Sequence, residues 1–309
     1  MTVSLSVHRP GSTSMAQLWE QFYAHLRIKR RSKATLIYYA CTQRALTRFL
    51  TAQGLPEDVE LVKVGHLRAF LIWLDGQGLK AGGVHAHARA VRSLFNWACR
   101  EELLPLNPAT RLELPSLVHK RLPTMTVEKV KRLLVACKTS GEPLRNAAIV
   151  LTLFDTGGRC QELLDLSASD LLFERGMIRV MGKGSKERFV PIGARAMQAV
   201  VAYGRRERRP NHDGVQSVFL GRTGQKLTPS GVGLKLLRLA REGGLTRADC
   251  SPHTFRRGFA VEFLRNGGDV FTLQHIMGHA SLDMTRRYVS FLDEDLKSAH
   301  LRFSPGDRL

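Results

Sequence analysis

The sequence predicts a mostly α-helical protein of the α+β class, built in two parts. Three observations support this prediction. Apolar residues recur at helical spacing over most of the 309 residues, a proline-rich stretch interrupts that pattern, and one glycine- and lysine-rich turn joins two strand-like runs. A chain of this length can form two modest domains, each with its own core. We therefore predict an N-terminal four-helix domain over residues 1–103, a linker over 104–123, and a helical second domain with a small β-hairpin or sheet over 124–309.

Four amphipathic patterns fill the N-terminal part. In the first helix, Leu18 and Phe22 lie one turn apart on the same face. Ser32 is the expected N-cap of the second helix, which is expected to end at Gly54. Together the four patterns predict a helical bundle with basic rims. They cover residues 16–28, 34–54, 64–78 and 82–102.

The linker is predicted from its prolines, because proline favours extended backbone over helix. After it the helical pattern returns, with Thr126 as a candidate N-cap and a strongly apolar run over 143–157. Residues 177–181 and 188–192 form the strand-like runs of the predicted hairpin. Further helices are predicted over residues 194–206, 229–244, 253–268, 270–278 and 282–292.

The net charge indicates a polyanionic partner. The chain has 47 Lys and Arg residues against 27 Asp and Glu residues, a formal charge of +20. Nucleic acid is the expected partner, and a generic basic surface protein is the alternative. Five cysteines without a CxxC pair predict neither a disulfide framework nor a zinc site. Without an apolar leader or a membrane-spanning stretch, we expect a cytoplasmic protein with no membrane partner.

Four short stretches of the second part carry reactive groups: "TGGRCQEL", "GKGSKER", "HTFR" and "GHASLDMTRRY". Taken alone, each has an ordinary interpretation as a surface ion pair, a solvated turn, a helix-face pair or a helix cap. Their joint occurrence in a basic protein favours a functional site. The candidate residues are Arg159, Glu162, Lys183, His253, Arg256, His279 and Tyr288.

These residue types suit the exchange of phosphodiester bonds without a metal. Guanidinium forks bind phosphate oxygens in pairs and keep their charge, so two of them can stabilise the negative charge that develops on the non-bridging oxygens. A lysine can protonate the leaving oxygen, and histidine can give or take protons near neutral pH. A tyrosine can attack phosphorus and hold it as an ester.

The motifs resemble those of the tyrosine recombinases, also called phage integrases, over about residues 124–292. The matching segments are "TGGRCQEL", "GKGSKER", "HTFR", "GH" and "TRRY". The four-helix region resembles the family's core-binding domain, which makes residues 124–309 the catalytic domain with a C-terminal tail. The overall length is similar to that of Xer-like and mobile-element recombinases.

The resemblance implies a role for each residue. Tyr288 is the nucleophile, which forms a 3′-phosphotyrosyl link to DNA and frees a 5′-hydroxyl. Arg159 and Arg256 clamp the scissile phosphate. Lys183 is the general acid for the leaving 5′ oxygen, with Lys186 as its rival.

Three further roles follow from the same resemblance. His253 assists proton transfer at the nucleophile, and His279 donates a hydrogen bond to the phosphate. Glu162 supports the site from behind the residues that touch DNA. No metal, nucleotide or other cofactor is implied, because the tyrosyl ester conserves the energy of the broken bond.

The leading hypothesis is therefore a site-specific recombinase that acts on double-stranded DNA as a tetramer on two DNA sites, in integration, excision or resolution. A partner recombinase or accessory protein is left open. One alternative is a nicking and closing enzyme like a type IB topoisomerase. Another is a DNA-binding regulator that kept the fold and lost catalysis. The apolar spacing of the tail after Tyr288 favours a contact between subunits, and the intact set of site residues argues against the regulator.

Overall fold

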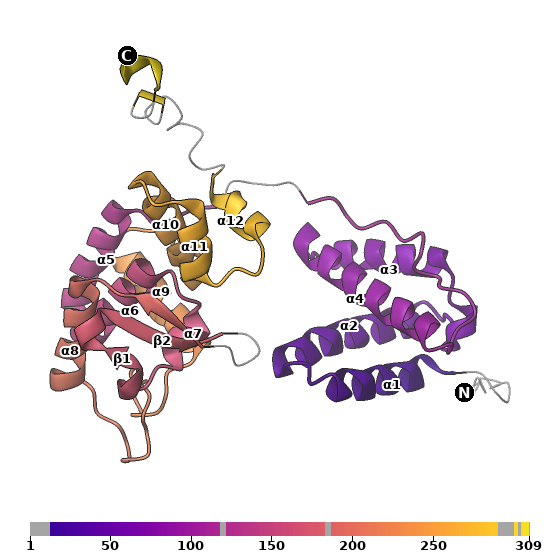
Figure 1. The fold of residues 1–309 in the computed structure, drawn as a ribbon. Helices are drawn as coiled ribbons and strands as arrows, with labels where there is room; N and C mark the ends of the chain where they lie inside the picture. Colours follow the sequence, from indigo (N-terminus) through magenta and orange to yellow (C-terminus); the bar gives the residue numbers. More distant parts are fainter. Residues whose placement is uncertain (1–12, 118–121, 183–186, 290–299, 302–303, 309) are drawn as a thin grey trace. The chain divides into compact units, whose positions relative to one another are not determined.

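The computed structural model describes residues 13–117, 122–182, 187–289, 300–301 and 304–308 of the chain (Figure 1). It divides into two compact units, Met1–Lys120 and Arg121–Leu309. Both are built mainly of helices, and the second also holds a small antiparallel sheet. The predicted fold class is therefore confirmed. Within these ranges, no helix is both long enough and apolar enough to cross a membrane.

The described residues of the first unit, 13–117, contain four α-helices, as predicted. Their amphipathic faces meet in one core that is rich in aromatic rings, including the fully buried Trp19, Phe49, Phe70 and Phe95. Ser32 caps the second helix, since its hydroxyl accepts a hydrogen bond from the Thr35 N–H at 3.2 Å. The helices are α1 (Met15–Ile28), α2 (Lys33–Ala52), α3 (Val64–Gly76) and α4 (Ala81–Arg100).

Part of the stretch predicted as a linker packs against this first core. Leu104, Ala109 and Leu112 are buried in the same cluster as the helical side chains. The prolines there break the helical period, but the apolar residues between them still reach the bundle. The domain boundaries at 103 and 123, with the functions assigned to each part, stay a prediction.

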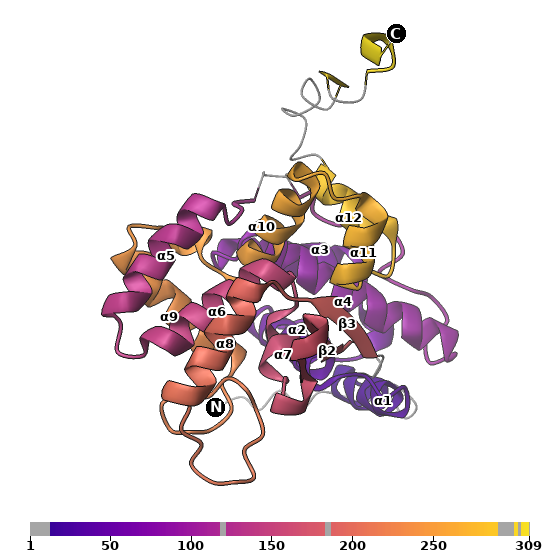
Figure 2. The ribbon, with the colours of Figure 1, turned by 60° about the vertical axis from the view of Figure 1, so that its left-hand side comes forward.

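The second unit surrounds one central helix. Helix α6 packs against α5, α8 and α10, and its buried side chains include Ala148, Val150 and Leu153 (Figure 2). A glycine in the left-handed conformation, Gly157 with φ +57°, ends α6. The helices are α5 (Val127–Thr139), α6 (Pro143–Thr156), α7 (Cys160–Leu164), α8 (Ala194–Arg206), α9 (Pro229–Glu242), α10 (Pro252–Arg265), α11 (Val270–Met277) and α12 (Leu282–Val289).

The predicted hairpin forms two strands of a three-stranded sheet. Strands β1 (Leu171–Leu172), β2 (Met177–Met181) and β3 (Glu187–Pro191) are antiparallel and lie in that order. Met181 is paired with Glu187, so residues 182–186 connect β2 to β3 in the sequence. The predicted general acid Lys183 and its rival Lys186 lie outside the described residues.

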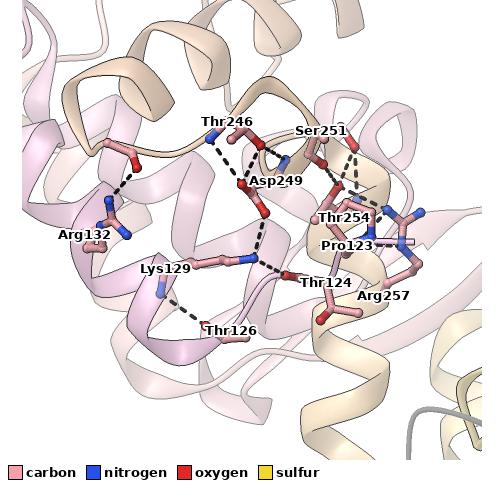
Figure 3. Close-up of polar contacts among 12 residues, drawn as sticks. Pro123, Thr124, Thr126, Lys129, Arg132, Thr246, Asp249, Ser251, Thr254 and Arg257 are labelled. Carbon is pink, nitrogen blue, oxygen red and sulfur yellow. Dashed lines mark hydrogen bonds and ion pairs between the residues drawn. The ribbon is translucent and has the colours of Figure 1, made fainter. Parts of the chain in front are cut away.

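The start of the second unit is fastened to α10 and the loop before it (Figure 3). Arg257, on α10, donates from Nε and Nη2 to the Pro123 carbonyl at 3.0 and 2.8 Å. Lys129 donates from Nζ to the Thr124 carbonyl at 3.2 Å and to the Asp249 carboxylate at 2.7 Å. Residues 123–126 are thereby held against the helix that carries the "HTFR" motif.

Candidate active site

Helix α11 ends in a glycine turn that places a histidine next to its last carbonyls. Gly278 adopts the left-handed conformation with φ +62°. Its N–H donates to the His275 carbonyl, and the His279 N–H donates to the Gln274 carbonyl, each at 3.1 Å. This is a Schellman turn, in which glycine is preferred because it has no Cβ. The "GH" pair in the sequence therefore marks a helix C-terminus with further carbonyls still to be satisfied.

Three arginines from different elements bind at this helix end. Arg188, on β3, donates to the carbonyl of residue 276 at 3.3 Å. Arg256, on α10, donates to the carbonyl of residue 277 at 2.8 Å. Arg159, just before α7, donates to the carbonyl of residue 278 at 3.2 Å. The C-terminal end of a helix carries partial negative charge, which favours cations. The end of α11 thus gathers three guanidiniums that lie far apart in the sequence.

Glu162 fixes two of these arginines. Its Oε1 accepts from Arg159 Nη1 at 2.8 Å and from Arg188 Nη1 at 3.0 Å. Its Oε2 accepts from Arg188 Nη2 at 2.7 Å and from the Arg159 backbone N–H at 2.9 Å. Burial opposes ionisation of Glu162, but the bonds from Arg188 and Arg159 outweigh it and lower the pKa to about 2. Three guanidiniums against one carboxylate leave two positive charges, an environment that attracts an anion.

Arg256 is the most deeply placed of the three, with a relative exposure of 6%. Its Nη1 donates to the Gly157 carbonyl at 2.6 Å, so it links the ends of α6 and α11. Burial and the neighbouring charge of Arg159 lower its pKa to about 10, which leaves it charged at neutral pH. The two carbonyls use two of its five N–H donors and fix the plane of the guanidinium.

His279 and Tyr288 lie together beside the arginines. Their ring centroids are 6.1 Å apart, with the planes within 16° of parallel. His279 is buried, and its Nδ1 lies 2.9 Å from the Thr285 hydroxyl oxygen. Burial, and then the charge of Arg256, lower the pKa of His279 to about 4, so the ring is neutral at neutral pH. Helix α12 therefore places Tyr288 beside His279, which lies nine positions earlier in the sequence.

Of the predicted site residues, one cluster gathers Arg159, Glu162, Arg256, His279 and Tyr288. His253 lies one helical turn before Arg256 at the start of α10, where its side chain is exposed. Lys183 cannot be placed among them, because it lies outside the described residues.

Sequence reasoning missed Arg188 as a site residue. It is the last residue of "GKGSKER", in which only the lysines were predicted to act, and the first residue of the predicted strand-like run 188–192. In β3 the exposed Glu187 and Phe189 alternate with Arg188 and the buried Val190. The two-residue period of a strand therefore puts Arg188 on the inner face, a signal that could have identified it.

The described part of the site does not resemble a metal centre. Across the described ranges, no group of three or more His, Cys, Asp or Glu side chains could hold a metal ion. Glu162 already accepts four hydrogen bonds from two arginines, and the guanidiniums around it repel cations. The donors suit a phosphate group instead.

Comparison with known proteins identifies the family. The phage integrase family model matches residues 123–294, and the model of the phage integrase N-terminal SAM-like domain matches residues 19–102. The chain belongs to the phage integrase family, the tyrosine recombinases. It is a tyrosine site-specific recombinase, an enzyme that breaks and rejoins DNA strands.

Named relatives align over nearly the whole chain. Tyrosine recombinase XerC of Bacillus pumilus is 31% identical over 301 residues, covering 95% of this chain and 98% of the relative. Tyrosine recombinase XerD of Oceanobacillus iheyensis is 29% identical, covering 93% and 97%. The Tn1549 transposon integrase, solved with a circular intermediate DNA, shares the fold with a TM-score of 0.72 at 22% identity, covering 90% and 95%. A lambda integrase dimer bound to a core site gives 0.72 at 19% identity, covering 92% and 82%.

Proposed function

We propose that this recombinase exchanges DNA strands through a 3′-phosphotyrosyl intermediate, with neither a metal ion nor a nucleotide cofactor. The Tyr288 oxygen attacks the scissile phosphorus, and the bond from phosphorus to the 5′ oxygen breaks. The new ester preserves the phosphodiester energy, so an incoming 5′-hydroxyl can reverse the step and join a different strand. The observation that carries the proposal is the gathering of Tyr288, His279 and the arginines at the end of α11.

Arg159 and Arg256 are proposed to bind the non-bridging oxygens of the phosphate. Both guanidiniums are held in place by backbone carbonyls, and Arg159 also by Glu162. Donors fixed before the substrate arrives need little reorganisation when negative charge develops on the non-bridging oxygens. The excess positive charge of the cluster supports the same assignment.

Proton transfer is assigned to the remaining residues. Nδ1 of His279 is engaged with Thr285, which leaves Nε2 to donate to a phosphate oxygen while the ring stays neutral. His253 assists proton transfer at Tyr288. Lys183 protonates the leaving 5′ oxygen, with Lys186 as the alternative donor.

The proposed substrate is double-stranded DNA, bound by a tetramer on two sites during integration, excision or resolution. The net charge of +20 supports it. So does the exposed face of α4 in the first unit, where basic and polar side chains recur at helical spacing and border a hollow of about 630 Å³. Its lining includes Arg89, Arg92, Ser93, Asn96 and Arg100. The integrase structures solved with DNA are consistent with this substrate.

Covalent trapping tests the proposal. Fragments of DNA from the protein's own replicon are nicked close to the cleavage position, so that the freed strand end diffuses away and the adduct cannot reseal. With a chelator present, wild-type protein is expected to form a protein–DNA band on a denaturing gel, and Tyr288→Phe is expected to form none. A band that survives in Tyr288→Phe, or that requires a divalent metal, would contradict the proposal.

A further inference from the structure

All three guanidinium nitrogens of Arg188 make hydrogen bonds within the protein. It makes a two-pronged pair with Glu162, at 3.0 and 2.7 Å, and its Nε bonds the Ile276 carbonyl. Its side chain is 15% exposed, against 39% for that of Arg159. The less exposed arginine therefore faces the carboxylate, and the more accessible arginine is left to face an anion.

Glu162 can hold either arginine in a two-pronged pair, but not both. With Arg188 in place, only one side-chain nitrogen of Arg159 reaches the carboxylate, and its other terminal nitrogen bonds the Gly278 carbonyl. If Arg188 were absent, the bonds from the Arg159 side chain and backbone N–H would still favour the charged carboxylate, and Arg159 would be its remaining partner. Arginine and carboxylate favour the paired geometry, which would turn Arg159 toward Glu162.

We propose that Arg188 is a positioning residue, which neutralises Glu162 so that Arg159 stays directed at the scissile phosphate. The inference rests on the proposed function, because it assumes that Arg159 binds that phosphate. It explains why a carboxylate lies beside the phosphate arginines without weakening them. It also gives the "GKGSKER" segment a role in addition to its lysines.

The test uses Arg188→Met, which removes the charge but keeps an extended side chain, and the double variant Arg188→Met with Glu162→Gln. Single-turnover adduct formation is measured on two nicked substrates with saturating protein. One has an ordinary scissile phosphate, and the other has a methylphosphonate, in which a methyl group replaces one charged oxygen. Arg179→Met is the matched control, since Arg179 lies on β2 and pairs with Asp170 at 2.8 Å.

We expect Arg188→Met to slow adduct formation on the phosphate substrate by about 10-fold or more, since complete loss of one such donor costs about 100- to 1,000-fold. The loss of rate is expected to be smaller on the methylphosphonate, because that group carries less negative charge for an arginine to stabilise. The double variant is expected to recover most of the rate, because a neutral amide does not capture Arg159. Arg179→Met is expected to match wild type on both substrates.

An equal defect of Arg188→Met on both substrates, without recovery in the double variant, would overturn the inference and indicate a role in folding alone. A rate equal to wild type would overturn it as well. Wild-type protein that forms no adduct on the phosphate substrate would instead overturn the proposed function, so the two failures are distinguishable.

Discussion

Gly278 shows how one backbone conformation organises the site. A Cβ there would strain a left-handed residue and lie 3.0 Å from Nε and Cζ of Arg188. We expect Gly278→Ala to cost about 1–2 kcal/mol in conformational strain and to slow adduct formation. Gly54→Ala is the matched control, since Gly54 has φ +57° and no atom within 4 Å of an added Cβ. Thermal unfolding and adduct rates check both variants, and equal loss of rate in the two would contradict the account.

His279 makes stability depend on pH through its lowered pKa. Its ordinary pKa is about 6.5 and its folded pKa about 4, so between these values the unfolded chain binds more protons. Stability is therefore fully present above about pH 6.5 and declines as the pH falls toward 4. Comparing thermal unfolding at pH 7.5 and 5.5, we expect wild type to lose more stability than His279→Asn. An equal loss in the two proteins would contradict the buried, neutral histidine.

The sequence motifs identified most side chains of the candidate active site, because the types and order of the residues already suggest phosphate chemistry. Arg188 was missed for a physical reason. The period of the strand could have placed Arg188 on the inner face. Its partner is a carboxylate 26 positions earlier in the chain, and no local pattern shows that pairing. The pKa shifts of Glu162 and His279 depend on burial and on charges from other elements, so they too required the structure.

Among the elements, the contacts at the start of the second unit hold α10 in place. Lys129 and Asp249 form the pair shown in Figure 3, and the bonds from Lys129 and Thr246 lower the pKa of Asp249 to about 2. This contribution to stability is present above the ordinary Asp pKa of about 3.9 and is lost as the pH falls toward 2. At pH 7 we expect Lys129→Met to lower the unfolding temperature, and the gap from wild type to narrow by pH 3. A difference in unfolding temperature that does not change with pH would contradict a stabilising ion pair between Lys129 and Asp249.

Long helices were predictable from the sequence, and the shortest elements were not. Periodicity and caps such as Ser32 and Thr126 gave helix bounds within a few residues. The five-residue α7 and the two-residue β1 are too short to show a period. The apolar residues of 104–112 have no period either, so their packing against the first core could not be foreseen.

For the whole molecule, the charge of +20 predicts DNA binding that weakens steeply with salt. Each phosphate neutralised contributes about 0.9 to the slope of log affinity against log salt concentration. Arg89 and Arg92 line the polar face of α4, so Arg89→Gln with Arg92→Gln is expected to reduce the slope by about 2. Fluorescence anisotropy over a salt series measures it, with Arg179→Gln as control. An unchanged salt slope in the double variant would contradict a contact between α4 and DNA.

In the proposed mechanism, the Tyr288 oxygen becomes covalently joined to DNA. The most direct test is to trap the adduct on nicked DNA, trim the DNA with nuclease, digest the protein and sequence the modified peptide by mass spectrometry. We expect a nucleotide joined through its 3′ phosphate to Tyr288, in a peptide that follows Arg159, Arg256 and His279 in the sequence. A nucleotide on another residue, or one joined through a 5′ phosphate, would contradict the proposed mechanism.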